Sequence, residues 1–269
     1  MPNPNETPSS SQKETDFENQ INEAGSFFNV TSENSVKLLG ESLMSEESMA
    51  VFIVVTPKNS SDAQREEEIK SYLKSFVSIM AEYINRYYEV KGPQFITDLD
   101  SWLRPLNALP LMSRANIEKH EFKRNEPGTE IASQLISLFY KPNSIASEEF
   151  KNFLRDRSRR IKDLINRNGS FKMIFVVSSI EIVGNGSEQK HSAKIKLFKT
   201  ELNKNNSGWI DNCNNSAKID INVEYSLVIS ELNIAELRNN DTKKALDRFI
   251  QSTRKFDDYN DGNFYEGAY

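Results

Sequence analysis

The sequence predicts an α/β protein, a three-layer α/β/α sandwich whose mainly antiparallel central sheet is flanked by helical layers. Three observations predict this fold. Helical patterns dominate the first half of the chain, and three long strand patterns joined by Gly- and Asn-rich turns follow in the second half. Consecutive strands joined by such turns form an antiparallel meander. The pattern at 171–183 is apolar on both faces, as expected of a strand covered by helices on both sides.

The clearest predicted helix runs to about residue 90. Ser61 and Gln64 form a capping-box signature at its start, and Gly92-Pro93 follows its last turn. Pro105 and Pro110 interrupt the next helical pattern, so we expect Trp102 to lie in a short piece. The residues expected on the inner face of the long helix are Ile69, Leu73, Phe76, Met80, Tyr83, Ile84 and Tyr87. Further helical patterns occupy 17–28, 35–43, 129–140, 148–166, 231–238 and 242–254.

Two shorter segments are candidates for additional strands. Residues 49–56 form a β-branched run that ends at Pro57, and we expect a buried strand there that can join the sheet. Residues 115–124 are highly charged, which fits either an edge strand or a loop.

The longest strand pattern covers residues 217–230 and follows the only cysteine. Its odd positions, from Ala217 to Ile229, are apolar, whereas its even positions are mostly polar. This period of two predicts one long strand with its odd positions facing the core. Cys213 has the same parity, so its thiol would face the core if the extended backbone reaches back that far.

We expect one domain over residues 16–256, between a disordered tail at 1–15 and a polar tail at 257–269. The chain has 269 residues, of which 37% are hydrophobic and 27% charged, as in water-soluble globular proteins. A net charge of −5 argues against a nucleic-acid partner. No apolar run is long enough to span a bilayer, and the polar N-terminus has no apolar signal region. We therefore expect a cytoplasmic protein in the producing cell, with release by another route left open.

A single cysteine leaves three possibilities open for Cys213: an inert core residue, an intermolecular bridge, or a reactive or modified thiol. The common catalytic signatures are absent, and His120 and His191 lie in polar surroundings. We therefore expect no enzymatic activity, no metal site, no cofactor and two ordinary surface histidines. A nucleophilic pair of Cys213 with His191 remains an alternative, since such partners meet only in space.

A basic stretch lies near the end of the predicted helix at 148–166. Its central residues are Arg155, Arg159, Arg160 and Lys162. One interpretation is a contact with anionic lipid headgroups. The other is a solvated helix face whose cations complement the C-terminal helix dipole.

The stretch Ser207-Gly208-Trp209-Ile210-Asp211-Asn212-Cys213, leading into 217–229, resembles the corresponding part of a known group. Together with the element order, it is similar to the cytolytic (Cyt) δ-endotoxin fold and, within it, to the Erwinia virulence factor family. The resemblance implies a sheet between two helical layers and a role in bacterial infection or persistence in an insect host. Carried onto Cys213, it implies a palmitoyl thioester. The toxins of this fold open membranes, but the charged composition here is unlike that of a membrane-inserting toxin.

The leading hypothesis is therefore a non-enzymatic bacterial virulence factor that is S-palmitoylated on Cys213 and associates peripherally with membranes. Its expected partners are fatty acid and a membrane surface, and its host target is not specified by the sequence. A palmitoyl chain has about fifteen carbons beyond its carbonyl, whose burial is worth roughly 12 kcal/mol. Two alternatives remain, a pore-forming cytolysin and an acyl hydrolase or transferase that uses Cys213.

Overall fold

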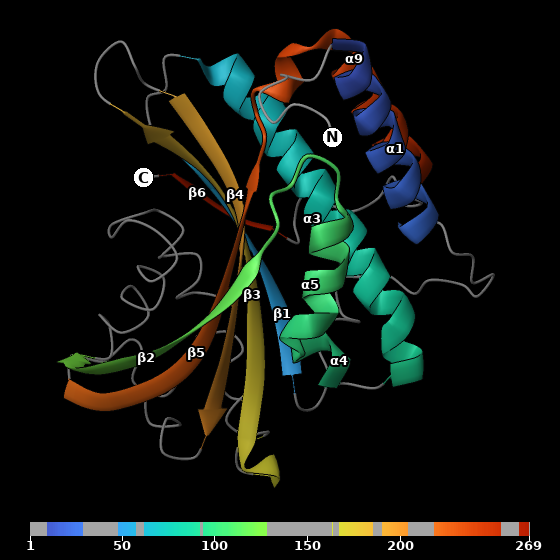
Figure 1. The fold of residues 1–269 in the computed structure, drawn as a ribbon. Helices are drawn as coiled ribbons and strands as arrows, with labels where there is room; N and C mark the ends of the chain where they lie inside the picture. The colour runs from blue at the N-terminus through green and yellow to red at the C-terminus, as the bar shows by residue number, and fades with distance from the viewer. Residues whose placement is uncertain are drawn as a thin grey trace, which may run out of the picture.

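The computed structural model describes residues 10–28, 48–57, 62–91, 94–127, 163, 167–184, 190–203, 218–253 and 264–268. Within them, six strands form one sheet in the order β2-β5-β4-β3-β1-β6 (Figure 1). The strands are β1 (Ser48–Thr56), β2 (Asn116–Pro127), β3 (Ser170–Val183), β4 (Lys190–Asn203), β5 (Lys218–Leu232) and β6 (Phe264–Ala268). The predicted α/β fold with a mainly antiparallel sheet is confirmed.

The sheet contains the expected meander and three further strands. β3 pairs antiparallel with β4, β4 with β5, and β5 with the edge strand β2. β1 joins the sheet parallel to β3, and β6 pairs parallel with the other side of β1. The strand expected at 49–56 therefore belongs to the sheet, and the charged segment at 115–124 is an edge strand rather than a loop.

The described helices lie together on one face of the sheet, which we call the helical face (Figure 1). They are α1 (Ser10–Phe28), α3 (Ala63–Lys91), α4 (Gln94–Thr97), α5 (Leu99–Ala108), the 3-10 turn η3 (Glu236–Arg238) and α9 (Asn240–Thr253). The helices expected at 35–43, 129–140 and 148–166 lie outside the described residues, apart from Asp163.

α3 is the helix against which most of this layer packs, and its predicted inner face is confirmed. Ile69, Leu73 and Phe76 are fully buried, whereas Tyr87 is only partly buried. The Asp62 side chain accepts a hydrogen bond from the Arg65 backbone N–H at 3.1 Å and caps the helix, whereas Ser61, the cap expected from the sequence, lies outside the described residues.

Both faces of β3 are buried, as three layers require. Ile174, Val176 and Ile180 belong to the core shared with the helices, while Phe175 and Val177 are buried on the opposite face. The same alternation continues on β4. The register pairs Val176 with Leu197 on the face shared with the helices and Phe175 with Phe198 on the opposite face. We call the side that bears Phe175 the second face of the sheet.

The predicted inward parity of β5 is wrong over its C-terminal half. Val228 and Ser230, at even positions, are fully buried on the helical face, whereas Ile229 is 41% exposed on the second face. The buried Ser230 hydroxyl donates to the Ser113 carbonyl at 2.6 Å, which removes the cost of burying it. Alternation identifies the two faces of a strand, but here the more polar face meets the helices.

Three element boundaries also differ from expectation. α1 already begins at Ser10, inside the segment expected to be a disordered tail. Phe264–Ala268 forms β6, inside the segment expected to be a polar tail, because its backbone hydrogen-bonds to the open side of β1. Pro105 lies within α5 rather than dividing it, with its ring buried. Trp102 on the same helix is fully buried, and its ring N–H donates to the Ile96 carbonyl at 2.6 Å.

Candidate functional site

The residues predicted to carry function from the sequence lie outside the described part of the chain. These are Cys213 and the basic stretch of Arg155, Arg159, Arg160 and Lys162. The described part of β5 begins at Lys218, five positions after Cys213. The palmitoyl site, the lipid contact and the pairing of Cys213 with His191 therefore stay predictions.

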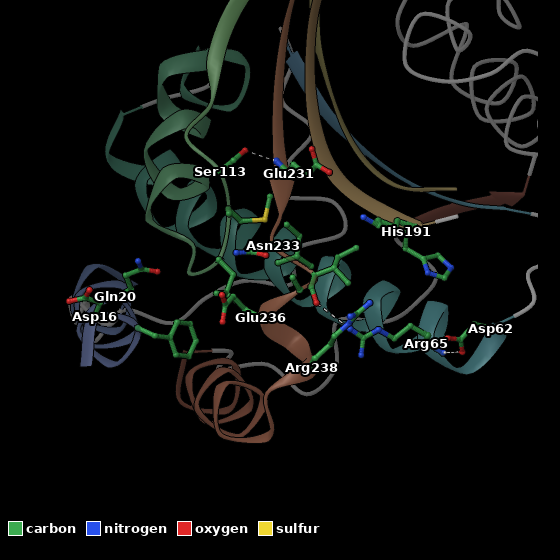
Figure 2. Close-up of a pocket in the computed structure, with 17 residues that line it drawn as sticks. Asp16, Gln20, Asp62, Arg65, Ser113, His191, Glu231, Asn233, Glu236 and Arg238 are labelled. Atoms are coloured by element: carbon green, nitrogen blue, oxygen red, sulfur yellow. Dashed lines mark hydrogen bonds between the residues drawn. The ribbon is translucent and has the colours of Figure 1, made fainter. Parts of the chain in front are cut away.

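The structure instead brings together a cleft beside the end of β5. It has a volume of 1180 Å³ and is lined by α1, the start of α3, the segment after α5, the start of β4, and η3 (Figure 2). The lining residues are Asp16, Phe17, Gln20, Asp62, Arg65, Leu111, Met112, Ser113, Lys190, His191, Glu231, Leu232, Asn233, Ile234, Ala235, Glu236 and Arg238. No motif in the sequence pointed to this cleft, because its residues come from five separate stretches of the chain that only the fold brings together.

One side of the cleft is held by hydrogen bonds between the segment after α5 and the end of β5. The Ser113 N–H donates to the Glu231 carbonyl at 2.8 Å, and the Asn233 N–H donates to the Leu111 carbonyl at 2.9 Å. The Glu231 N–H donates to the Ser113 hydroxyl oxygen at 2.8 Å. Leu111 has a φ of 63°, a left-handed conformation that is uncommon for residues other than glycine. These bonds hold a strained turn in place.

The side chains of Arg65 and His191, which line the cleft, are fixed by contacts with α3 and its neighbours. One Arg65 nitrogen donates to the Ile234 carbonyl at 3.2 Å, and another lies 3.1 Å from a Glu68 carboxylate oxygen. His191 Nε2 lies 3.0 Å from Glu66 Oε1, and the Glu66 side chain is only 7% exposed. The prediction that His191 is an ordinary surface histidine is therefore wrong. Its side chain is 20% exposed and joins β4 to α3.

His120 fits the surface expectation better. Its side chain is 40% exposed and Nε2 lies 3.2 Å from a Glu118 carboxylate oxygen. Its ring stacks on Tyr225 with centroids 5.2 Å apart, and Tyr225 stacks on the buried Phe198 at 4.5 Å. Burial raises the pKa of Tyr225. Rings from three neighbouring strands thus form a continuous row on the second face.

The second face also carries an ion cluster that the sequence did not reveal. Glu181 accepts hydrogen bonds from Lys196 at 2.8 Å and from Lys194 at 3.1 Å. Burial alone would raise the pKa of Glu181, but the two lysine ammonium groups outweigh it and hold that pKa below its usual value. The Lys196 side chain is only 10% exposed, so this cluster neutralises charge within a largely buried part of the sheet.

Among the residues described, no group of three or more His, Cys, Asp or Glu side chains is arranged to hold a metal ion. The helices within the same residues include none that is both long and apolar enough to cross a bilayer.

A family model described as "Virulence factor Evf" matches residues 45–269. The chain belongs to the Evf virulence factor family. The solved structure of the Evf virulence factor superposes with a TM-score of 0.75, covering 91% of this chain and 94% of that one at 12% sequence identity. The fold of the chain is therefore the fold of the Evf structure. Among curated protein sequences, none matches this chain.

Two toxin structures are more distant. The activated Cyt2Ba monomer from Bacillus thuringiensis subsp. israelensis has a TM-score of 0.31 and 9% identity, covering 67% of this chain and 97% of its own. A delta-endotoxin has a TM-score of 0.33 and 9% identity, covering 75% of this chain and 87% of its own.

The range matched by the Evf family includes Cys213 and every described strand, and it begins after α1. α1 nevertheless packs into the same core. Phe28 is fully buried, with its ring centroid 6.1 Å from those of both Tyr83 and Phe249. Arg86 donates to the Phe28 carbonyl at 2.8 Å.

Proposed function

We propose that this protein is a bacterial virulence factor that carries a palmitoyl thioester on Cys213 and associates with membranes through it. The observation that carries the proposal is the Evf family match over residues 45–269, which contains the only cysteine of the chain. We also propose that the host is an insect, as the resemblance to the Erwinia virulence factor implies.

On the protein, the chemistry of the proposal requires only this one side chain. The cysteine thiolate attacks the carbonyl of an activated acyl donor, such as a fatty-acyl thioester, and displaces the thiol of the donor as the new thioester forms. The attached chain must then be buried in the protein or in a bilayer, because its exposure to water costs roughly 12 kcal/mol. A single acyl chain anchors a protein only reversibly, so the basic stretch from Arg155 to Lys162 is proposed as a second, electrostatic contact with anionic lipid.

Flotation with anionic vesicles tests the membrane association. Wild-type protein from the producing bacterium should float with the vesicles, and treatment with neutral hydroxylamine, which cleaves thioesters, should release it. Cys213→Ser should remain at the bottom of the gradient, while Ser207→Ala, a nearby change that leaves the thiol intact, should float. Equal flotation of wild type and Cys213→Ser would exclude an anchor at this residue.

The same vesicles distinguish a lipid-anchored protein from a pore-forming cytolysin. Vesicles filled with a self-quenching dye should stay sealed while the acylated protein is bound to them. Release of the dye at the protein concentration that saturates flotation would favour a cytolysin instead.

A further inference from the structure

The 1180 Å³ cleft beside β5 has the features of a built binding site, and nothing in the proposed acylation of Cys213 uses it. Several of its polar groups are already fixed. Arg65 is held by Ile234 and Glu68, Asp62 caps α3, and the Ser192 hydroxyl donates to the Glu231 carboxylate at 2.7 Å. Groups fixed before binding lose little freedom when a ligand arrives.

The remaining charges on the rim have no partner within the described residues. The side chains of Asp16, Glu236, Lys190 and Arg238 are exposed and make no side-chain hydrogen bond or ion pair with any other described residue. These four charges are therefore available to a ligand.

The unpartnered charges of opposite sign lie at opposite ends of the cleft. Figure 2 shows Asp16 and Glu236 toward the α1 end, and Arg238, Arg65, His191 and Asp62 toward the α3 end. At the α3 end, Asp62 already accepts the Arg65 backbone N–H and Arg65 already pairs with Glu68. Lys190 adjoins His191 on β4, so the unpartnered charges at this end, Arg238 and Lys190, are both positive. A ligand that bears only one sign of charge would be repelled at one end. The arrangement fits a ligand with a cation at one end and an anion at the other.

Between these ends the lining is apolar, with polar groups that can bind a peptide backbone. Leu111, Met112 and Ile234 are partly buried and supply the apolar part. The exposed side-chain amide of Asn233 offers both a donor and an acceptor. The volume exceeds the range of about 300–1,000 Å³ that is usual for small-molecule pockets. These features favour a chain-like ligand over a compact one.

We propose that the cleft binds an extended polypeptide segment with an apolar centre, a basic residue at the α1 end and an acidic residue at the α3 end. The side chain of Asn233 hydrogen-bonds the backbone of the bound peptide, and the apolar side chains of the peptide cover Leu111 and Ile234. This partner is distinct from the lipid partner of the proposed function.

A displayed library of random peptides, selected on immobilised full-length Cys213→Ser protein, tests the proposal without any lipid anchor. Selected peptides should have an apolar centre flanked by opposite charges. Arg238→Glu should bind them about fivefold more weakly, and Asp16→Lys with Glu236→Lys should do the same. Arg248→Glu, which makes the same charge change on α9 outside this cleft, should leave their affinity unchanged. Circular dichroism establishes that each variant is folded.

Three results would overturn the proposal. One is a selection that enriches no peptide above an uncoated surface. A second is enrichment of peptides that bind the cleft variants and Arg248→Glu with equal affinity. The third is retention on zwitterionic phospholipid vesicles that is lost in Arg238→Glu while no peptide is enriched, which would assign the cleft to a lipid headgroup. Since all arms use Cys213→Ser, none of these results bears on acylation.

Discussion

The imidazole of His191 lies 3.0 Å from a carboxylate oxygen of Glu66 and ties the start of β4 to the first turn of α3. The carboxylate is nearly buried and lies at a helix N-terminus, where the helix dipole favours negative charge. The hydrogen bond from His191 satisfies an oxygen that has little access to water. This polar link joins the helical layer to the sheet at the edge of the cleft.

His191→Ala should therefore destabilise the fold by about 1–3 kcal/mol, because it leaves a nearly buried carboxylate oxygen without its donor. Urea unfolding followed by circular dichroism measures this change. His120→Ala is the matched control. Its side chain is 40% exposed, and its contacts are a stack on Tyr225 and the exposed Glu118, so its effect should stay below about 1 kcal/mol. Equal stability of the two variants would show that the His191 contact does not stabilise the fold.

Glu181→Gln should lower stability by about 2 kcal/mol at neutral pH, since it leaves Lys194 and Lys196 without their carboxylate. The folded-state pKa of Glu181 lies below its usual value. The contribution of Glu181 to folding stability is therefore fully present above its pKa in the unfolded chain, about 4.3. It is lost as the pH falls through its lower pKa in the folded protein.

Unfolding of wild type and Glu181→Gln across pH 3 to 8 checks this dependence. The difference between them should be largest above about pH 5 and should shrink below about pH 4. Glu201→Gln, an exposed change on the same hairpin, should show no such trend. A gap between wild type and Glu181→Gln that widens in acid would contradict the proposed role of the lysines.

Phe28→Ala should destabilise the whole domain by about 3–5 kcal/mol, because the fully buried ring packs between Tyr83 and Phe249. Phe28→Leu keeps much of the apolar volume and should cost less than half as much. Thermal unfolding with near-ultraviolet circular dichroism measures both. A wild-type Tm for Phe28→Ala would mean that α1 is not part of the cooperative unit.

Local sequence signals predicted the meander and the inner face of α3 because they act over short distances. A Gly- and Asn-rich sequence separates β3 from β4, and helical spacing places Ile69, Leu73 and Phe76 on one side. The parallel addition of β1 and β6 depends on long-range pairing, for which the sequence has no local signal. β6 is an example. Its five residues have no strand pattern of their own, and they form a strand because their backbone pairs with the edge of β1.

The cleft and the Glu66–His191 pair could not be predicted for the same reason. These two residues are 125 positions apart, and each is unremarkable in its local sequence. The prediction of which β5 positions face the helices was wrong for a different reason. Ser230 is polar yet fully buried, because the Ser113 carbonyl accepts its hydrogen bond. Period-two alternation shows which residues share a face of the strand. It does not show which face packs against the helices, because neighbouring residues can hydrogen-bond the polar groups that are buried there.

The intact mass of the protein purified from the bacterium that makes it, kept free of reductant and hydroxylamine, tests the proposed palmitoylation most directly. Wild type should be heavier than its sequence mass by about 238 Da, the mass that a palmitoyl thioester adds. Cys213→Ser should have its unmodified sequence mass. Hydroxylamine should lower the mass of the wild type to that of its unmodified sequence. A wild-type chain without the added mass, or an addition that persists in Cys213→Ser, would contradict acylation at Cys213.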